Sequence, residues 1–385
     1  MERRSFLRGA VIGTSAAAFG GTLMRGAAYA APAQPGAGPY GALGAANANG
    51  IQLPAGFTSR IIARSGQTVA GTSYTWHNAP DGGACFADGT GWIYVSNSEI
   101  SSTGGASALK FNSSGTVTSA YRILGNTNRN CAGGKTPWNT WLSCEEVDTG
   151  YVYETDPWGV NAAVRRAAMG RFNHEAAAAD PVRRAVYLTE DKSDGCFYRF
   201  VPSTWGNLSS GTLQVLVAGT ATSGSFTWQN VPDADGSPTA TRYQVSAAKK
   251  FNGGEGCHYA NDTVWFTTKG DNRLWQLNLA AGTYELAYDD SLVVGGAPLT
   301  GVDNVTGSSS GDLFVAEDGG NMEICVITPD DVVAPFLRIG GQSSSEICGP
   351  AFSPDGKRLY FSSQRGTSGS SSGGITYEVT GPFRA

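Results

Sequence analysis

The sequence predicts an all-β fold, a six-bladed β-propeller with a metal site on its axis, and three observations support this. From residue 52 onward, short β-branched and aromatic runs alternate with Gly, Asn, Asp and Ser turns, without a long helical period. A loose unit recurs six times at a spacing of roughly 45 to 60 residues, which is typical of propeller blades. Acidic residues recur at equivalent places in these units. We therefore assign residues 52–385 to the propeller.

Composition restricts the class of protein. Of 385 residues, 53 are glycine, 41% are hydrophobic and only 15% are charged, which describes a turn-rich and well-packed chain. The net charge is −5 and the 27 Lys and Arg residues are scattered, so we expect no nucleic-acid partner. Seven cysteines in an exported protein predict one or two disulfide bonds of unknown connectivity.

The N-terminus has the three parts of a Tat export signal. Arg3 and Arg4 form the twin-arginine pattern, residues 9–23 are apolar, and small residues surround position 30. The alternative is the basic amphipathic N-terminus of a cytosolic protein. We interpret residues 1–30 as a signal read by the Tat machinery and residues 31–51, rich in Ala, Gly and Pro, as a linker. The mature protein is then periplasmic or extracellular, without stable membrane insertion, and we expect a monomer.

The repeated unit places an acidic or amide residue before a small-residue strand, and a turn then leads to an aromatic strand that ends in polar groups. The copies are 81–84 with 92–97, 130–134 with 140–146, 172–175 with 185–191, 254–257 with 264–269, 302–305 with 313–318, and 345–348 with 359–365. Because the first strand of each blade lines the channel, the acidic residues would share one axial space and need cations. The alternative is that each acidic residue caps a turn.

One copy adds sulfur to the carboxylates. Cys144, Glu145 and Glu146 follow a short strand, and strand alternation would put Cys144 and Glu146 on one face and Glu145 on the other. A thiolate favours a transition metal and carboxylates favour calcium, so this copy suits a mixed site. The alternative is a buried structural cysteine beside solvated glutamates.

Several stretches together resemble the PhoX-type alkaline phosphatases: 130–146, 170–175, 187–191, 346–356, 364–366 and 381–383. The resemblance covers residues 52–385, and a Tat signal is typical of that family. It implies a six-bladed propeller whose axial site holds iron and calcium, with a cysteine thiolate on iron, and which hydrolyses phosphate monoesters. The chain departs from the family at Asn139, where glycine is usual, and it lacks long insertions.

The resemblance also implies metal ligands, position by position. Cys144 matches the iron-binding cysteine. The recurring acidic positions of the family are matched by Glu145, Glu175, Glu190, Asp191, Glu255, Glu317 and Glu346.

Two basic residues at the ends of aromatic strands, Arg365 and Lys269, are candidates to clamp the phosphoryl group. Their alternative role is a salt bridge to a neighbouring carboxylate. Two other functions remain open: a calcium-dependent propeller lactonase or esterase, which needs no thiolate, and a non-catalytic exported propeller stabilised by calcium. Cys144 distinguishes the phosphatase from the lactonase.

Overall fold

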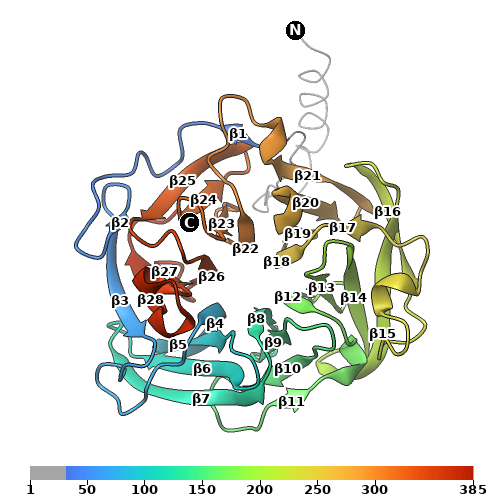
Figure 1. Cartoon of the computed structure of the whole chain (residues 1–385), viewed down its shortest axis with the longest axis horizontal. Coiled ribbons are helices and arrows are strands. Elements are labelled where there is room, and N and C mark those ends of the chain that lie inside the picture. Colours follow the sequence, from blue (N-terminus) through green and yellow to red (C-terminus); the bar gives the residue numbers. More distant parts are fainter. Residues whose placement is uncertain (1–31, 385) are drawn as a thin grey trace, which may run out of the picture.

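Antiparallel strands dominate residues 32–384, the part of the chain that the computed structural model describes, and no α-helix occurs among them. Figure 1 shows sheets arranged around a common axis, which confirms the all-β, propeller-like class. The predicted export signal, residues 1–30, lies outside the described residues. Short 3-10 helices connect some strands: η1 (Ala167–Met169), η2 (Thr241–Tyr243), η3 (Lys269–Asp271), η4 (Asp290–Leu292), η5 (Gly366–Ser368) and η6 (Ser371–Gly373).

Hydrogen bonds divide the described strands into five sheets. One contains β4 (Pro80–Asp88), β5 (Gly91–Ser98), β6 (Gly104–Phe111) and β7 (Val117–Thr127). The next contains β8 (Asn130–Lys135), β9 (Trp141–Glu145), β10 (Val152–Thr155) and β11 (Val164–Arg165). The last in the chain contains β26 (Ile347–Phe352), β27 (Arg358–Ser363), β28 (Ile375–Thr380) and β3 (Thr58–Arg64).

The two other sheets are larger. A ten-stranded sheet contains β12 (His174–Asp180), β13 (Ala185–Glu190), β14 (Gly195–Thr204), β15 (Asn207–Ala218), β16 (Gly224–Asn230), β17 (Lys250–Phe251), β18 (Gly254–Ala260), β19 (Thr263–Thr268), β20 (Arg273–Asn278) and β21 (Thr283–Asp289). A six-stranded sheet contains β1 (Gln34–Pro35), β2 (Ile51–Gln52), β22 (Val302–Gly307), β23 (Leu313–Glu317), β24 (Glu323–Ile327) and β25 (Val332–Ile339). The ten-stranded sheet is continuous because β16 pairs with β21.

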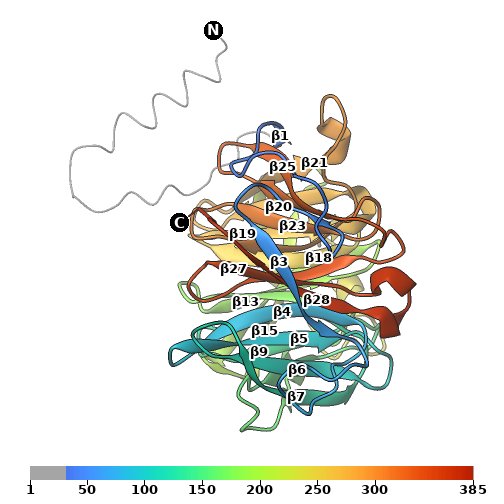
Figure 2. The same ribbon diagram turned by 90° about the vertical axis from the view of Figure 1, so that its left-hand side faces the viewer.

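The inner strands β4, β8, β12, β18, β22 and β26 surround the axis, and each contacts the next, including β26 with β4. An N-terminal strand completes the last sheet, since β3 pairs with β28 (Figure 2). Apolar clusters fill the spaces between sheets, and at the closure Trp92 donates a hydrogen bond to the hydroxyl of Tyr360 at 3.0 Å. Pairing of the early strand β3 with β28, the last strand, closes the ring and fixes the inner strands.

The segment that we expected to be a linker contacts the propeller along β25. Both β1 and β2 pair with that strand, and the side chains of Ala33 and Ile51 are buried. Low hydrophobic content does not prevent this packing, because the free edge of β25 supplies backbone partners.

The expectation of one or two disulfides is wrong. All seven cysteines lie in the described residues and all are unpaired. Each occupies a different strand, and no two are partners in a strand register. None of the helices in residues 32–384 has the length and apolar character to cross a bilayer.

Candidate metal centre

A bulge recurs at the start of every inner strand. Between two consecutive register pairs, each inner strand advances by three residues while its partner strand advances by only two. The inner strand therefore contains one extra residue at this point. A bulge of this kind redirects a side chain away from regular alternation. The second residue of each inner strand lies within or directly beside the bulge: Asp81, Cys131, Glu175, Glu255, Asp303 and Cys348.

These side chains converge at one end of the ring. Three groups have donor atoms within 4.8 Å of one another: Asp81 with Glu99 and Cys131; Cys131 with Glu146 and Glu175; and Glu175 with Glu255 and Asp303. Cys131 belongs to two of these groups, and so does Glu175. The groups therefore form a continuous chain of possible metal ligands around the axis.

Further charged side chains at this centre come from residues that directly follow the strands paired with the inner strands. Glu99, Glu146, Lys269 and Asp318 each come directly after a strand, and all four line a cavity of about 240 Å³. The same cavity is lined by Arg129, Cys131, Glu255, Asp303, Glu346 and Arg365. Its lining therefore consists of charged side chains and one thiol.

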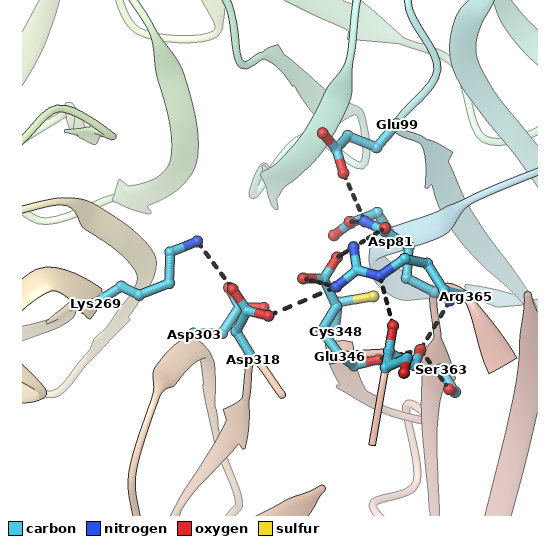
Figure 3. A network of polar contacts seen from close by, with 12 residues as sticks. Asp81, Glu99, Lys269, Asp303, Asp318, Glu346, Cys348, Ser363 and Arg365 are labelled. Atoms are coloured by element: carbon cyan, nitrogen blue, oxygen red, sulfur yellow. Dashed lines mark hydrogen bonds and ion pairs between the residues drawn. The ribbon is translucent and has the colours of Figure 1, made fainter. Parts of the chain in front are cut away.

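Three cations lie at this cavity, and each is held by two carboxylates. Arg129 lies 2.7 Å from both Glu99 and Glu146. Lys269 lies 2.8 Å from Glu255 and 3.4 Å from Asp318. Arg365 donates to both oxygens of Glu346 at 3.1 and 3.0 Å and lies 3.7 Å from Asp318 (Figure 3). Acidic groups outnumber basic ones among these residues, so the site attracts additional cations.

Burial and mutual repulsion disturb the titration of the acidic groups. Burial, followed by Glu255 and Glu146, raises the pKa of Glu175 well above its usual range. Burial raises the pKa of Glu255 to about 8 although Lys269 opposes it, and burial with Glu99 raises the pKa of Glu146 to about 9. The pKa of Asp81 rises to about 7 for the same two reasons. These carboxylates need protons or metal ions close by.

Glu175 shows this need most directly. Its side chain has no exposed surface, and neither carboxylate oxygen has a hydrogen-bond partner among the described residues. An ionised carboxylate left in this state is strongly unfavourable unless a cation coordinates it. The donor set therefore fits a metal ion beside Glu175.

Sequence reasoning placed six of its ten site residues at or beside this centre: Glu175, Asp191, Glu255, Lys269, Glu346 and Arg365. Asp191 follows β13, and its charge acts on both Glu146 and Glu255. Lys269 and Arg365 line the cavity and also form the salt bridges that were their alternative role.

None of the other four belongs to the three groups of possible ligands around the axis in residues 32–384. The charge of Glu175 nevertheless acts on the Cys144 thiol, and Glu317 belongs to a separate group of possible ligands with Glu323 and Cys325. Cys144 is fully buried in an apolar cluster with Leu142, Val152 and Phe172. Glu145 accepts from the backbone N–H groups of Asn128 and Tyr151. Glu190 and Glu317 make corresponding contacts with backbone N–H groups in their own sheets.

The thiol at the centre is Cys131, which was not among the predicted ligands, and neither were Glu99, Arg129 and Asp318. The repeat pattern placed Asp81 and Asp303 on the axis, and strand alternation placed Glu146 beside Cys144, but none of the three was predicted as a specific ligand. A signal existed in the repeat itself, because Asp81, Glu175, Glu255 and Asp303 open their copies. Cys131 occupies the same place in the copy that begins at residue 130.

Asn139, at the position where the resemblance leads us to expect glycine, has a φ of 65°. This is a left-handed conformation that asparagine tolerates better than most residues.

A second cavity of about 510 Å³ lies further along the inner strands, and no Asp or Glu is among its lining residues. The acidic site is therefore confined to one end of the ring.

Comparison with known proteins finds a family model and several solved structures that resemble this chain. The family model described as "Alkaline phosphatase PhoX" matches residues 93–149 and 147–274. The structure of PhoX from Pseudomonas fluorescens, in complex with the transition-state analogue vanadate, is 18% identical with a TM-score of 0.72, covering 88% of this chain and 97% of that chain.

Two further structures share the fold at lower similarity. A gluconolactonase from Xanthomonas campestris is 13% identical with a TM-score of 0.50, covering 89% of this chain and 98% of that chain. A Bacteroides thetaiotaomicron protein of unknown function is 9% identical with a TM-score of 0.52, covering 84% and 76%. No curated protein sequence matches the chain. Residues 93–274 of this chain thus resemble the PhoX alkaline phosphatases in sequence, and the chain shares the propeller-like fold of the Pseudomonas PhoX.

Proposed function

We propose that this chain is an exported, metal-dependent phosphatase that hydrolyses phosphate monoesters with iron and calcium bound at the axis. The family match and the vanadate complex of the Pseudomonas relative support phosphoryl chemistry. The observation that carries the proposal is the buried Glu175 carboxylate, which has no hydrogen-bond partner among residues 32–384 and lies close to Cys131 and Glu255 of a cavity that three cations line. Acidic ligands for metal and basic groups for phosphate thus lie in one site.

The donor chemistry divides the ligands between two kinds of metal. Cys131 belongs to two groups, one with Asp81 and Glu99 and one with Glu146 and Glu175, and a thiolate favours iron over calcium. Glu175, Glu255 and Asp303 offer only carboxylate oxygens, which suit calcium. When bound, these ions supply Lewis acidity, which activates an oxygen nucleophile and neutralises phosphoryl charge.

The chain itself binds and orients the substrate. Arg365 presents a guanidinium fork that matches two phosphate oxygens, while Lys269 and Arg129 add positive charge on the cavity wall. In the described structure carboxylates hold all three cations. If metal ions were bound to these carboxylates, the N–H groups of Arg129, Lys269 and Arg365 would be free to bind phosphate. Phosphoryl transfer depends mainly on such positioning and charge stabilisation.

The architecture and location belong to the same proposal. We count the ten-stranded sheet as two blades, which gives six blades in residues 52–385, each contributing one inner strand to the axis. We further propose that Tat machinery exports the chain through residues 1–30 and that the mature protein acts as a monomer outside the cytoplasm.

The test is elemental analysis and turnover of protein exported by its own Tat signal. Iron with calcium, a visible thiolate-to-iron absorption band and turnover of p-nitrophenyl phosphate are expected. Calcium without iron, together with lactone turnover, would support the lactonase alternative instead. Calcium with no hydrolysis of either substrate would support a non-catalytic propeller.

Arg365→Lys is expected to raise KM for p-nitrophenyl phosphate about tenfold, because lysine keeps the charge and loses the bidentate fork. The effect on kcat should be smaller. Arg338→Lys is the matched control, since Arg338 pairs with Glu323 away from the cavity. Steady-state kinetics measure KM and kcat of both variants. Equal KM values for the two would show that Arg365 does not bind the substrate.

The chelated protein should lose stability as pH rises from about 5 to about 9. The pKa values of Asp81, Glu255 and Glu146 in the folded protein are about 7, 8 and 9, above those of the unfolded chain. The folded state then binds more protons over this interval, so the free energy of unfolding falls with pH. Thermal unfolding at pH 5, 7 and 9 measures the trend, and calcium should flatten it. A melting temperature that rises with pH in chelator would contradict the assignment.

A further inference from the structure

We propose that Asn97 is a positioning residue that holds the Cys131 thiol toward the metal centre, an inference that rests on the proposed function. Asn97 lies in β5, in the sheet next to that of Cys131, and its side chain has no exposed surface. Its side-chain Nδ2 donates to the carbonyl oxygen of Cys131 at 3.0 Å and to that of Ala132 at 2.8 Å. Both bonds fall on the bulge of β8.

The bulge explains why these bonds are needed. The register of β8 with β9 shifts between Asn130 and Gly133, so Cys131 and Ala132 have no paired residue in the strand register. Backbone carbonyls in such a place require another donor if they are buried. Asn97 supplies both hydrogens from the neighbouring sheet and so fixes the backbone from which the thiol projects.

The orientation of the Asn97 amide is determined by its other contacts. Its Oδ1 accepts from Trp141 Nε1 at 2.9 Å and from Ser143 Oγ at 2.8 Å. The indole nitrogen is only a donor, so the amide oxygen must face Trp141 and the NH₂ group must face Cys131. Every hydrogen-bonding capacity of this amide is therefore in use, and the geometry is rigid.

Two other axial residues are held by a similar but weaker device. Thr189 Oγ1 donates to the carbonyl of Glu255, and Thr267 Oγ1 donates to the carbonyl of Asp303. In both cases the hydroxyl lies on the second strand of one four-stranded unit, β13 or β19, and its partner carbonyl lies on the inner strand of the next unit, β18 or β22. A hydroxyl has one hydrogen, whereas the Asn97 amide has two and holds both carbonyls of the bulge. The backbone at Cys131 is therefore held by more hydrogen bonds from the neighbouring sheet than the backbone at Glu255 or Asp303.

Asn97→Asp tests the inference, because it retains an acceptor for Trp141 and Ser143 and removes both donors. Cys131 lines the smaller cavity and Cys257 the larger one, and both are half-buried, so Cys257 is an internal reference. In metal-free protein, alkylation of Cys131 relative to Cys257, measured by peptide mass spectrometry, should become about tenfold faster. Iron affinity, measured by competition with a chelator, should fall about tenfold or more.

Thr267→Val is the matched control, because it removes one inter-strand bond at a carboxylate ligand and leaves the thiol restraint intact. Its Cys131-to-Cys257 labelling ratio should equal that of the wild type. If Asn97→Asp does not accumulate as folded protein, Asn97→Ser, which keeps a single shorter donor, takes its place with the same expected result. An unchanged labelling ratio and unchanged iron affinity in the folded variant would overturn the positioning role. Failure of the wild type to hydrolyse phosphate esters would overturn the proposed function and leave the labelling result standing.

Discussion

Replacing Cys131 with alanine should lower kcat/KM for p-nitrophenyl phosphate by at least about a thousandfold, roughly 4 kcal/mol of transition-state stabilisation. The thiol of Cys131 lies within 4.8 Å of donor atoms from Asp81 and Glu99, and also of donor atoms from Glu146 and Glu175. Its removal therefore takes the soft ligand from two groups at once. Turnover, iron content and the thiolate-to-iron absorption band should disappear together in the purified variant.

Cys144→Ala is the control for this prediction, because Cys144 is the thiol that the family resemblance implied. It is fully buried in an apolar cluster, so alanine should leave a small cavity and cost about 1 kcal/mol of stability. Activity at 25 °C should stay within about twofold of the wild type, since none of the metal-ligand groups in residues 32–384 contains Cys144. Loss of iron and turnover in Cys144→Ala, with both retained in Cys131→Ala, would reverse the assignment.

The sequence alone predicts the class of fold, because strands and turns alternate and the unit recurs at blade spacing. It also predicts that acidic residues meet on the axis, and Glu175, Glu255 and Glu346 do lie at the centre. The sequence does not reveal that β16 pairs with β21, since this contact depends on the length and twist of outer strands.

Glutamate recurs at the end of a strand in three copies of the repeated unit. Glu145, Glu190 and Glu317 end β9, β13 and β23, and each accepts a hydrogen bond from a backbone N–H group close by in its sheet. They recur because the blade architecture needs an acceptor there. Glu146 and Asp318, which follow Glu145 and Glu317, lie outside their strands and line the cavity, so regular strand alternation does not determine where their side chains point.

The bulges bear on which thiol lies at the centre. The family resemblance implied Cys144, but its strand is the second of its sheet and its side chains pack between sheets. The inner strand is β8, where the extra residue of the bulge redirects Cys131. A bulge depends on pairing with a neighbouring strand, and a single sequence does not show that register.

Glu175→Gln should stabilise the metal-free protein while reducing its response to calcium. Glu175 has no exposed surface and no hydrogen-bond partner for either oxygen among the described residues, and its pKa is raised by burial, Glu255 and Glu146. At pH 8 a neutral amide removes the cost of ionising or protonating this group, which should add about 1 to 3 kcal/mol to the free energy of unfolding. Thermal unfolding in chelator measures this gain.

The same substitution removes a ligand from two metal groups, so the calcium-induced rise in melting temperature should shrink and phosphatase turnover should fall about a hundredfold or more. Glu378→Gln is the matched control, because Glu378 is equally buried but is held by Arg60, Arg358 and Tyr360. That variant should lose stability with and without calcium, since it leaves basic partners unpaired. If Glu175→Gln lowers the stability of the metal-free protein as Glu378→Gln does, Glu175 is held by favourable contacts and is not reserved for a cation. Suppose instead that Glu175→Gln raises the free energy of unfolding in chelator and reduces the calcium-induced rise in melting temperature. This result would show that the Glu175 carboxylate lowers the stability of the metal-free fold and is retained as a metal ligand.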